Sequence, residues 1–159
     1  MNSNKPVLYA EDEENDVFLM ERAFKKADIA NPLRIVPDGK MAVEYLSGTG
    51  RYANRAAHPM PGLVLLDLNM PGKPGLDVLE WLRAEPATST LLVVVFTSSN
   101  QDRDVHRAYS LGANGYLIKP GKPDELWVTV KLIKDYWLGQ NRMPPEHVDV
   151  VAGQANKSR

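Results

Sequence analysis

The sequence of 159 residues contains no cysteine. This absence excludes disulfide bonds, thiolate nucleophiles and cysteine-based zinc sites, and it agrees with a reducing compartment such as the cytoplasm. No apolar run reaches the roughly 20 residues that span a bilayer. The amino-terminal stretch MNSNKPVLYAEDEEND carries acids where a signal peptide needs a long apolar segment. We therefore predict a cytoplasmic protein without a secretory signal or a membrane anchor.

The sequence also lacks an excess of either charge. It contains 19 lysines and arginines and 20 aspartates and glutamates, which give a formal net charge of -1. A chain without bulk positive charge is not suited to non-specific binding of nucleic acid or anionic lipid. The three histidines, His58, His106 and His147, are scattered along the chain, so no histidine metal cluster is indicated. Any charged site must be a local arrangement of side chains.

Five short apolar runs alternate with segments of helical periodicity. The runs occupy residues 6–10, 33–36, 62–66, 91–96 and 115–118. Alternation of this kind is typical of β-α-β units, in which a parallel sheet is buried between helices. The sequence therefore predicts an α/β fold with three layers.

Two segments do not fit this repeat. Residues 47–62 form an insertion rich in glycine, proline and alanine, and residues 139–159 form a polar tail. Arg51, Arg55 and His58 of the insertion could contact acidic groups of a partner, but a solvated loop is the simpler interpretation. We assign residues 5–138 to one domain and expect no output domain, because neither segment is long enough to form one.

Polar side chains follow four of the five predicted strands, at the point where each strand ends. Glu11 and Asp12 follow the first strand, Asp67 the third, Thr97 the fourth and Lys119 the fifth. The carboxyl ends of parallel strands meet at one edge of a sheet, which is where ligands bind in open α/β folds. We therefore expect these five side chains to form one site.

This set of side chains suits phosphoryl chemistry. Glu11, Asp12 and Asp67 would repel one another unless a cation lay among them, and Mg²⁺, or Mn²⁺ in its place, prefers such oxygen ligands. Asp67 could accept a phosphoryl group, whose oxygens Lys119 and Thr97 could then bind. Taken singly, each residue has a simpler structural explanation as a turn former, helix-start acid, strand end or solvated charge. Their coincidence at one edge favours the functional interpretation.

The motifs AED, LLDLNMPG, FTSSN and YLIKP occur in an order and spacing that resemble the CheY-like receiver domain of bacterial two-component response regulators. The resemblance spans about residues 5–138 and implies a flavodoxin-like, doubly wound (βα)5 fold with strand order 2-1-3-4-5. It implies that Asp67 accepts a phosphoryl group from a sensor histidine kinase or a histidine phosphotransfer protein. The insertion and the ending DYWLGQNRMPP resemble a subgroup of stand-alone regulators, several of which are paired with phytochrome-type kinases.

The resemblance also implies the metal ligands. Asp12, Asp67 and the backbone carbonyl of Asn69 would bind the metal, and Glu11 would act through a metal-bound water. One departure from the family pattern is Pro74, which stands where receivers usually carry an aspartate before the glycine of this loop. The entry to the third helix is therefore expected to differ.

The resemblance further implies a switch. Lys119 would bind the phosphoryl group and Thr97 would move toward it, which would let Tyr116 turn inward and change the surface of the fourth helix and fifth strand. A half-buried tyrosine beside the sheet is the structural alternative for Tyr116. The bond between Lys119 and Pro120 resembles one that is cis in receivers, although only about 5 to 6% of bonds preceding proline are cis in folded proteins.

Output must then come from protein contacts. Leu126, Val130, Tyr136 and Trp137 belong to a last predicted helix that is apolar over a broad surface. We expect a homodimer through the fourth helix, fifth strand and fifth helix, with these four residues at its interface. A broad contact with the protein's own core is the alternative explanation.

Three other functions remain open from the sequence. A flavin-binding electron carrier would need a phosphate-binding loop after the first strand, where this chain has AEDEEND. A phosphoaspartyl hydrolase would usually carry a second acid two residues after the nucleophile, where Asn69 stands. A degenerate receiver would only bind partners, but the complete set of site residues argues against it. We favour a phosphoacceptor signalling protein, not an enzyme, that assists its own phosphorylation and dephosphorylation.

Overall fold

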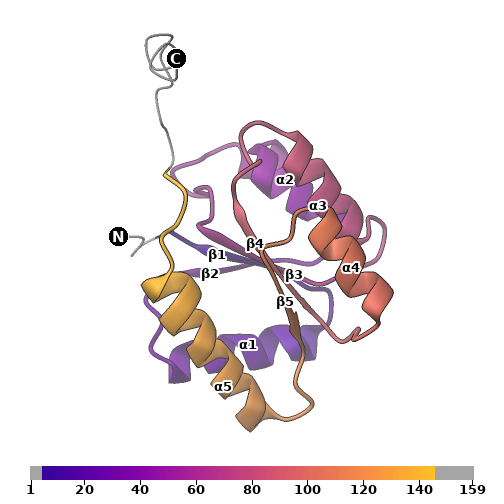
Figure 1. Ribbon diagram of the computed structural model, residues 1–159. Coiled ribbons are helices and arrows are strands. Elements are labelled where there is room, and N and C mark those ends of the chain that lie inside the picture. The colour runs from indigo at the N-terminus through magenta and orange to yellow at the C-terminus, as the bar shows by residue number, and fades with distance from the viewer. Residues whose placement is uncertain (1–4, 146–159) are drawn as a thin grey trace, which may run out of the picture.

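The computed structural model describes residues 5–145, which form a five-stranded parallel sheet between two layers of helices (Figure 1). The strands are β1 (Val7–Ala10), β2 (Leu33–Val36), β3 (Leu63–Leu66), β4 (Leu92–Thr97) and β5 (Gly115–Ile118). The helices are α1 (Glu14–Lys26), α2 (Gly39–Ser47), α3 (Gly75–Ala84), α4 (Asp102–Ser110) and α5 (Pro123–Leu132). The strand order is β2-β1-β3-β4-β5. This confirms the predicted fold.

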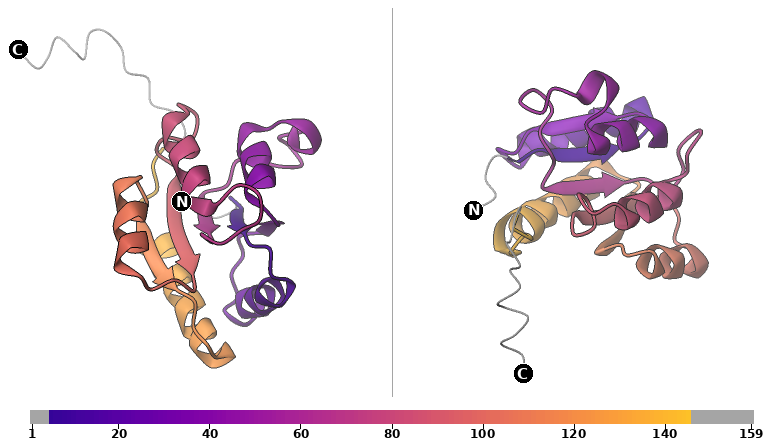
Figure 2. Two further views of the ribbon diagram at one scale, coloured as in Figure 1. Left: turned by 90° about the vertical axis from the view of Figure 1, so that its right-hand side faces the viewer. Right: turned by 90° about the horizontal axis from the view of Figure 1, so that it is seen from above.

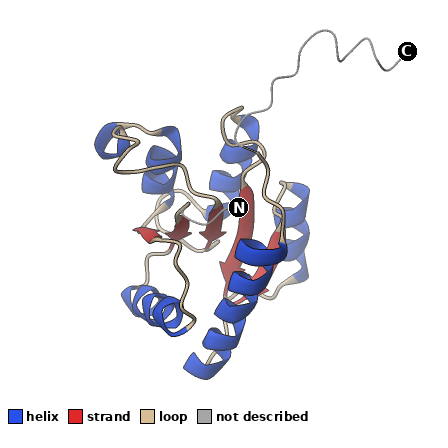
Figure 3. Ribbon diagram, turned by 90° about the vertical axis from the view of Figure 1, so that its left-hand side faces the viewer, coloured by secondary structure: helices blue, strands red, loops and turns tan. Residues whose placement is uncertain are grey.

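Two hydrophobic clusters pack on opposite faces of the sheet. Helices α2, α3 and α4 cover one face, and α1 and α5 cover the other (Figure 2 and Figure 3). Alternate residues of β1 point to different clusters, so that Leu8 joins the first and Tyr9 the second. Every residue of β1, β3 and β4 is buried, which explains why these strands read as unbroken apolar runs.

The insertion between α2 and β3 is tied to the end of α2. It contains a short 3-10 helix, η1 (Gly50–Tyr52), and Arg55 donates hydrogen bonds to the carbonyl oxygens of Tyr45 at 2.7 Å and Leu46 at 2.8 Å. These are carbonyls that an isolated helix would leave unpaired. The His58 ring is nearly perpendicular to the rings of Tyr45 and Tyr52, with centroid distances of 6.0 and 5.2 Å. Arg55 is therefore a structural cap, not a free basic group in a solvated loop.

The chain after α5 also packs on the domain. It continues as a π-helix, η2 (Ile133–Gln140), in which Ile133 is buried, and Met143 is buried beyond it. The Met143 sulfur lies 3.2 Å from the position a Cβ would take at Gly62. The packed part of the chain thus runs past residue 138, and the functional division between domain and tail stays a prediction.

The predicted interface set on the last helix is wrong for two of its four residues. Leu126 and Val130 are buried among the residues of α1 and the sheet, so they offer no surface to a partner. Trp137 is half-buried, and Tyr136 is 52% exposed. The apolar residues of this helix occupy two faces, and the core takes the face that contains Leu126 and Val130.

Two further features can be stated for residues 5–145. No peptide bond in this range is cis, so the bond between Lys119 and Pro120 is trans, unlike the bond that the resemblance implied. No helix in this range is both long and apolar enough to cross a bilayer.

Candidate functional site

The acidic residues predicted at the strand ends meet at the carboxyl edge of the sheet. One carboxylate oxygen each from Glu11, Asp12 and Asp67 lies within 4.8 Å of the others. Sheet hydrogen bonding continues past the strands and fixes this placement, because the Glu11 amide donates to Val36 at 3.0 Å and the Asp67 amide to Ala10 at 3.2 Å. Glu11 and Asp67 are buried, whereas Asp12 is half-buried. The predicted acidic cluster is therefore present.

Lys119, which follows β5, forms hydrogen bonds to this acidic cluster. Its amide donates to the Thr97 carbonyl at 2.8 Å, and its ammonium donates to carboxylate oxygens of Glu11, Asp67 (3.0 Å) and Asp16 (2.9 Å). Asp16 was not among the predicted site residues. It lies in the first turn of α1, the helix that follows the acidic pair, and that position was the available signal.

Burial dominates the electrostatics of Glu11. Loss of solvent raises the pKa of this carboxyl to about 7; the hydrogen bond from Lys119 lowers the pKa, and the charge of Asp67 raises it. The Tyr9 hydroxyl donates to Glu11 at 3.0 Å, and burial raises the pKa of that hydroxyl well above its usual range. Burial lowers the pKa of Lys119, but hydrogen bonds to three carboxylates outweigh it and raise that pKa above its usual value.

The hydroxyl groups of Thr97 and Tyr116, the two predicted switch residues, differ in their hydrogen bonding. The Thr97 side chain is fully buried, and its hydroxyl has no hydrogen-bond partner within the part of the chain that the structure describes. The Tyr116 hydroxyl donates to the Ser99 carbonyl at 2.9 Å, and Ser99 in turn donates to the Asp104 carboxylate at 2.5 Å. Ser99 therefore links Tyr116 to the start of α4, a link that the sequence did not predict.

The loop after Asp67 is held close to the sheet. The Asn69 amide donates to the Asp67 carboxylate at 3.2 Å, while the role of the Asn69 carbonyl stays a prediction. A Cβ at Gly75 would lie 2.2 Å from the Asp67 carbonyl oxygen, so only glycine allows α3 to begin this close to β3. Pro74 occupies the N-cap position of α3 in an extended conformation with no side-chain cap. The Gly75 amide instead donates to Leu68 at 3.1 Å.

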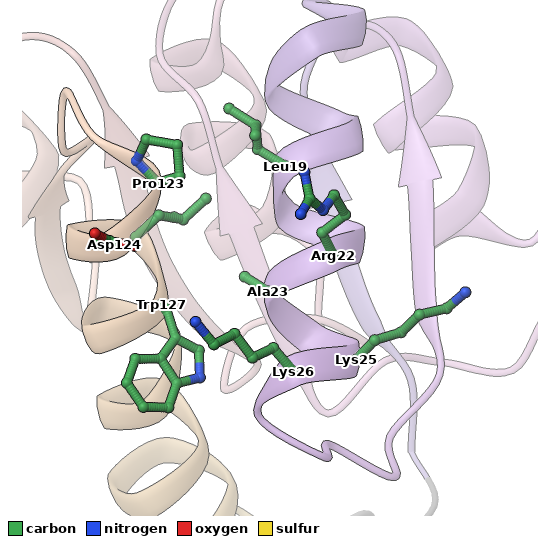
Figure 4. Close-up of a pocket in the computed structure, with 9 residues that line it drawn as sticks. Leu19, Arg22, Ala23, Lys25, Lys26, Pro123, Asp124 and Trp127 are labelled. Carbon is green, nitrogen blue, oxygen red and sulfur yellow. The ribbon is translucent and has the colours of Figure 1, made fainter.

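A groove between α1 and α5 adjoins this site (Figure 4). It has a volume of about 370 Å³, and the basic side chains that line it are those of Arg22, Lys25 and Lys26. The Lys26 ammonium lies 4.5 Å from the ring centroid of Trp127, within the range of a cation–π interaction. A second cavity, lined by Asp16 and Lys119 among others, shares Leu19, Pro123 and Leu126 with this groove. The groove next to the acidic site is therefore lined by three basic side chains together with the carboxylate of Asp124.

Two relatives resemble most of the chain in sequence. The probable methanogenesis regulatory protein FilR2 of Methanothrix harundinacea is 38% identical over 138 residues, which cover 87% of this chain and 86% of that protein. The response regulator Rcp1 of Synechocystis sp. is 36% identical over 143 residues, which cover 90% of this chain and 95% of that protein. Both similarities therefore cover at least 86% of each of the compared sequences.

Solved structures agree with the fold. The phosphorylated cyanobacterial phytochrome response regulator RcpA matches with a TM-score of 0.83 at 32% identity, and the Mn²⁺-bound form of Rcp1 matches with a TM-score of 0.81 at 35% identity. Each match covers 89% of this chain and 99% of the other chain. The family model described as the response regulator receiver domain matches residues 7–131. Together with the strand order and the clustered strand-end residues, this shows that the chain belongs to the response regulator receiver domain family of two-component signalling.

Proposed function

We propose that the protein accepts a phosphoryl group on Asp67 in a histidine-to-aspartate phosphorelay. One observation carries the proposal: the buried Asp67 carboxylate lies 3.0 Å from the Lys119 ammonium and within 4.8 Å of the carboxylates of Glu11 and Asp12. Phosphoryl transfer needs positioning and neutralisation of charge more than covalent help from the protein. The site combines a positioned acceptor, a cation and the ligands for a second cation.

A divalent metal fits the acidic cluster. Three converging carboxylates supply hard oxygen ligands, and a single ammonium does not neutralise them. We expect Asp12, Asp67 and the Asn69 carbonyl to hold Mg²⁺ or Mn²⁺, with Glu11 acting through a bound water. When bound, the ion supplies positive charge to the phosphoryl oxygens. The Mn²⁺-bound structure of the relative Rcp1 supports this proposal.

The transfer itself exchanges one bond to phosphorus for another. A carboxylate oxygen of Asp67 forms a bond to phosphorus as the phosphorus–nitrogen bond to the donor histidine breaks, and the released imidazole nitrogen takes up a proton. Lys119 redirects the hydrogen bond that it now donates to Asp67 toward a phosphoryl oxygen. The hydroxyl of Thr97, which has no hydrogen-bond partner among residues 5–145, donates to a second phosphoryl oxygen. Attack of water on the phosphorus later breaks its bond to the Asp67 oxygen, which releases inorganic phosphate and restores the carboxylate.

The signal leaves through the surface near α4 and β5. As Thr97 turns toward the phosphoryl group, the loop that contains Ser99 moves with it. Ser99 accepts from Tyr116 and donates to Asp104, so its movement alters both the tyrosine and the start of α4. Two packings that differ by a few kcal/mol are enough for such a switch. The partner that delivers the phosphoryl group is a sensor histidine kinase, of the phytochrome type, or a histidine phosphotransfer protein, as the phytochrome relative RcpA supports.

The central experiment measures intact mass after exposure to acetyl phosphate with Mg²⁺. We expect the parent to gain one phosphoryl group and Asp67→Asn to gain none. Asp77→Asn removes an exposed carboxylate on α3 and serves as the matched control that keeps the gain. An unmodified parent, or a gain that survives Asp67→Asn, would falsify the proposal.

A homodimer through α4, β5 and α5 belongs to the same proposal. The exposed face of α5 and η2 carries Val128, Leu132 and Tyr136, which are 53%, 62% and 52% exposed and are spaced four residues apart. An apolar stripe of this kind is typical of a protein interface. We expect light scattering over a dilution series to show dimers for the parent and monomers for Leu132→Glu. A monomer at every concentration, with and without phosphorylation, contradicts the dimer.

A further inference from the structure

Asp16 binds the ammonium of Lys119 although it is not one of the three carboxylates that converge as candidate metal ligands. Its Oδ2 accepts from the Lys119 Nζ at 2.9 Å, across 103 residues of sequence. The Asp16 side chain is 34% exposed, whereas those of Glu11 and Asp67 are almost completely buried. Asp16 thus contacts Lys119 from the solvent side of the site.

The three carboxylates together account for every hydrogen of the ammonium. A lysine ammonium has three N–H donors and no acceptor, and Lys119 donates to Glu11, Asp16 and Asp67. The lysine side chain is flexible, so the direction of its charge depends on its acceptors. Glu11 and Asp67 hold the ammonium from the inside of the site. Without Asp16, the third hydrogen would face the cavity that Asp16 and Lys119 line.

We infer that Asp16 is a positioning residue. It holds the Lys119 ammonium in the orientation from which it can donate a hydrogen bond to the phosphoryl group on Asp67. The inference rests on the proposed function. When Asp67 becomes an acyl phosphate, the hydrogen that it now accepts from Lys119 passes to a phosphoryl oxygen. The bonds to Glu11 and Asp16 do not have to break, so the ammonium keeps its orientation before and after transfer. Asp16 acts on the reaction only through Lys119.

The first test observes Lys119 directly in the metal-free protein. In a sample with ¹⁵N-labelled lysine, held cold at mildly acidic pH, we expect a resolved Lys119 ammonium signal that is protected from exchange, assigned by its absence in Lys119→Met. Asp16→Asn should broaden or remove this signal. Glu14→Gln, which removes an exposed charge from the same first turn of α1, should leave it unchanged. A signal that is unaltered in Asp16→Asn overturns the inference.

The second test follows the rate of phosphorylation by acetyl phosphate with Mg²⁺. Loss of one charge-assisted hydrogen bond at a partly exposed site corresponds to a rate about three- to tenfold lower in Asp16→Asn than in the parent. In the Lys119→Met background, Asp16→Asn should have no further effect. An equal loss in both backgrounds overturns the inference, and so does faster phosphorylation of Asp16→Asn, which would make Asp16 a competitor of the phosphoryl group.

The two tests separate this inference from the proposed function. If the parent does not accept a phosphoryl group, the proposed function fails, and the ammonium signal still shows whether Asp16 orients Lys119. If the parent is phosphorylated and Asp16→Asn behaves as Glu14→Gln does in both tests, only the inference about Asp16 fails. If Lys119→Met accepts no phosphoryl group, the ammonium signal alone decides.

Discussion

The two ends of the sheet each hold a basic side chain among oxygen acceptors, but the acceptors differ in charge. At the amino end of β4 and β5, Arg83 donates to the carbonyl oxygens of Gly112 and Leu91 at 2.9 and 2.8 Å and to the Asn114 side chain at 2.9 Å. At the carboxyl end, Lys119 donates to three carboxylates. The neutral acceptors around Arg83 form hydrogen bonds that stabilise the fold and require no further charge. The three carboxylates around Lys119 exceed its single positive charge, so this end keeps negative charge that a further cation can neutralise.

The largest expected effect comes from the amino end. Arg83→Met would leave several partly buried carbonyl oxygens without their donor, so we expect the free energy of unfolding to fall by about 2 to 4 kcal/mol. Urea denaturation measures the loss. Arg103→Met removes an exposed arginine of α4 and should change stability by about 0.5 kcal/mol or less. If the folded Arg83→Met protein failed to accept a phosphoryl group, the two ends would not be independent.

The second prediction concerns the carboxyl end of the sheet and the dependence of its stability on pH. Burial raises the pKa of Glu11 from 4.5 to about 7, so between these values the folded protein binds more protons than the unfolded chain. Stability must then fall as the pH rises through this window. We expect a loss of about 1 to 3 kcal/mol in metal-free parent and a flatter profile in Glu11→Gln.

Urea denaturation at several pH values in the presence of a chelator makes this measurement. Arg83 gives the contrast, because a guanidinium stays protonated at all these pH values. Arg83→Met should therefore shift the whole stability profile down without changing its slope between pH 4.5 and 7. A parent profile as flat as that of Glu11→Gln contradicts the prediction.

The third prediction uses metal in place of protons. An ion that binds only the folded protein stabilises it by about 1.4 kcal/mol at a concentration ten times its Kd. We expect Mg²⁺ to stabilise the parent by this amount and to leave Asp12→Asn unchanged. Asp77→Asn should respond as the parent does, and sodium chloride at matched ionic strength should give no effect. Equal stabilisation of Asp12→Asn by Mg²⁺ would place the ion elsewhere.

The difference between the two ends also explains what the sequence could predict. The carboxyl end was predictable because its residues follow apolar strands, and parallel topology brings strand ends together. Glu11, Asp67 and Lys119 all lie where that argument places them. The roles of Arg83 and Arg55 were not predictable, since their acceptors are mostly backbone carbonyls and carbonyls have no sequence signature.

The helix at the end of the chain shows a second limit. Leu126 and Val130 were predicted at an interface, whereas they belong to the core, and the exposed apolar stripe lies on the opposite face at Val128 and Leu132. Helical periodicity identifies apolar faces but does not say which of two faces meets the sheet. The role of Asp16 was not predicted for a related reason. Its partner Lys119 follows β5, 103 residues further along the chain, and only the folded structure brings the two side chains together.

The smallest expected effect on stability is that of Tyr116→Phe, which tests the proposed switch without altering the phosphoryl acceptor. Tyr116→Phe removes one hydrogen bond, from the hydroxyl to the Ser99 carbonyl, and should lower stability by about 0.5 to 1.5 kcal/mol. The acceptor of the phosphoryl group is untouched, so Tyr116→Phe should be phosphorylated as the parent is. Because Ser99 also bonds Asp104, we expect phosphorylation to change hydrogen exchange in the first turn of α4 in the parent and much less in Tyr116→Phe. Tyr109→Phe, which removes an exposed hydroxyl from α4, should keep the full change, and an undiminished change in Tyr116→Phe would mean that the signal reaches α4 without the tyrosine.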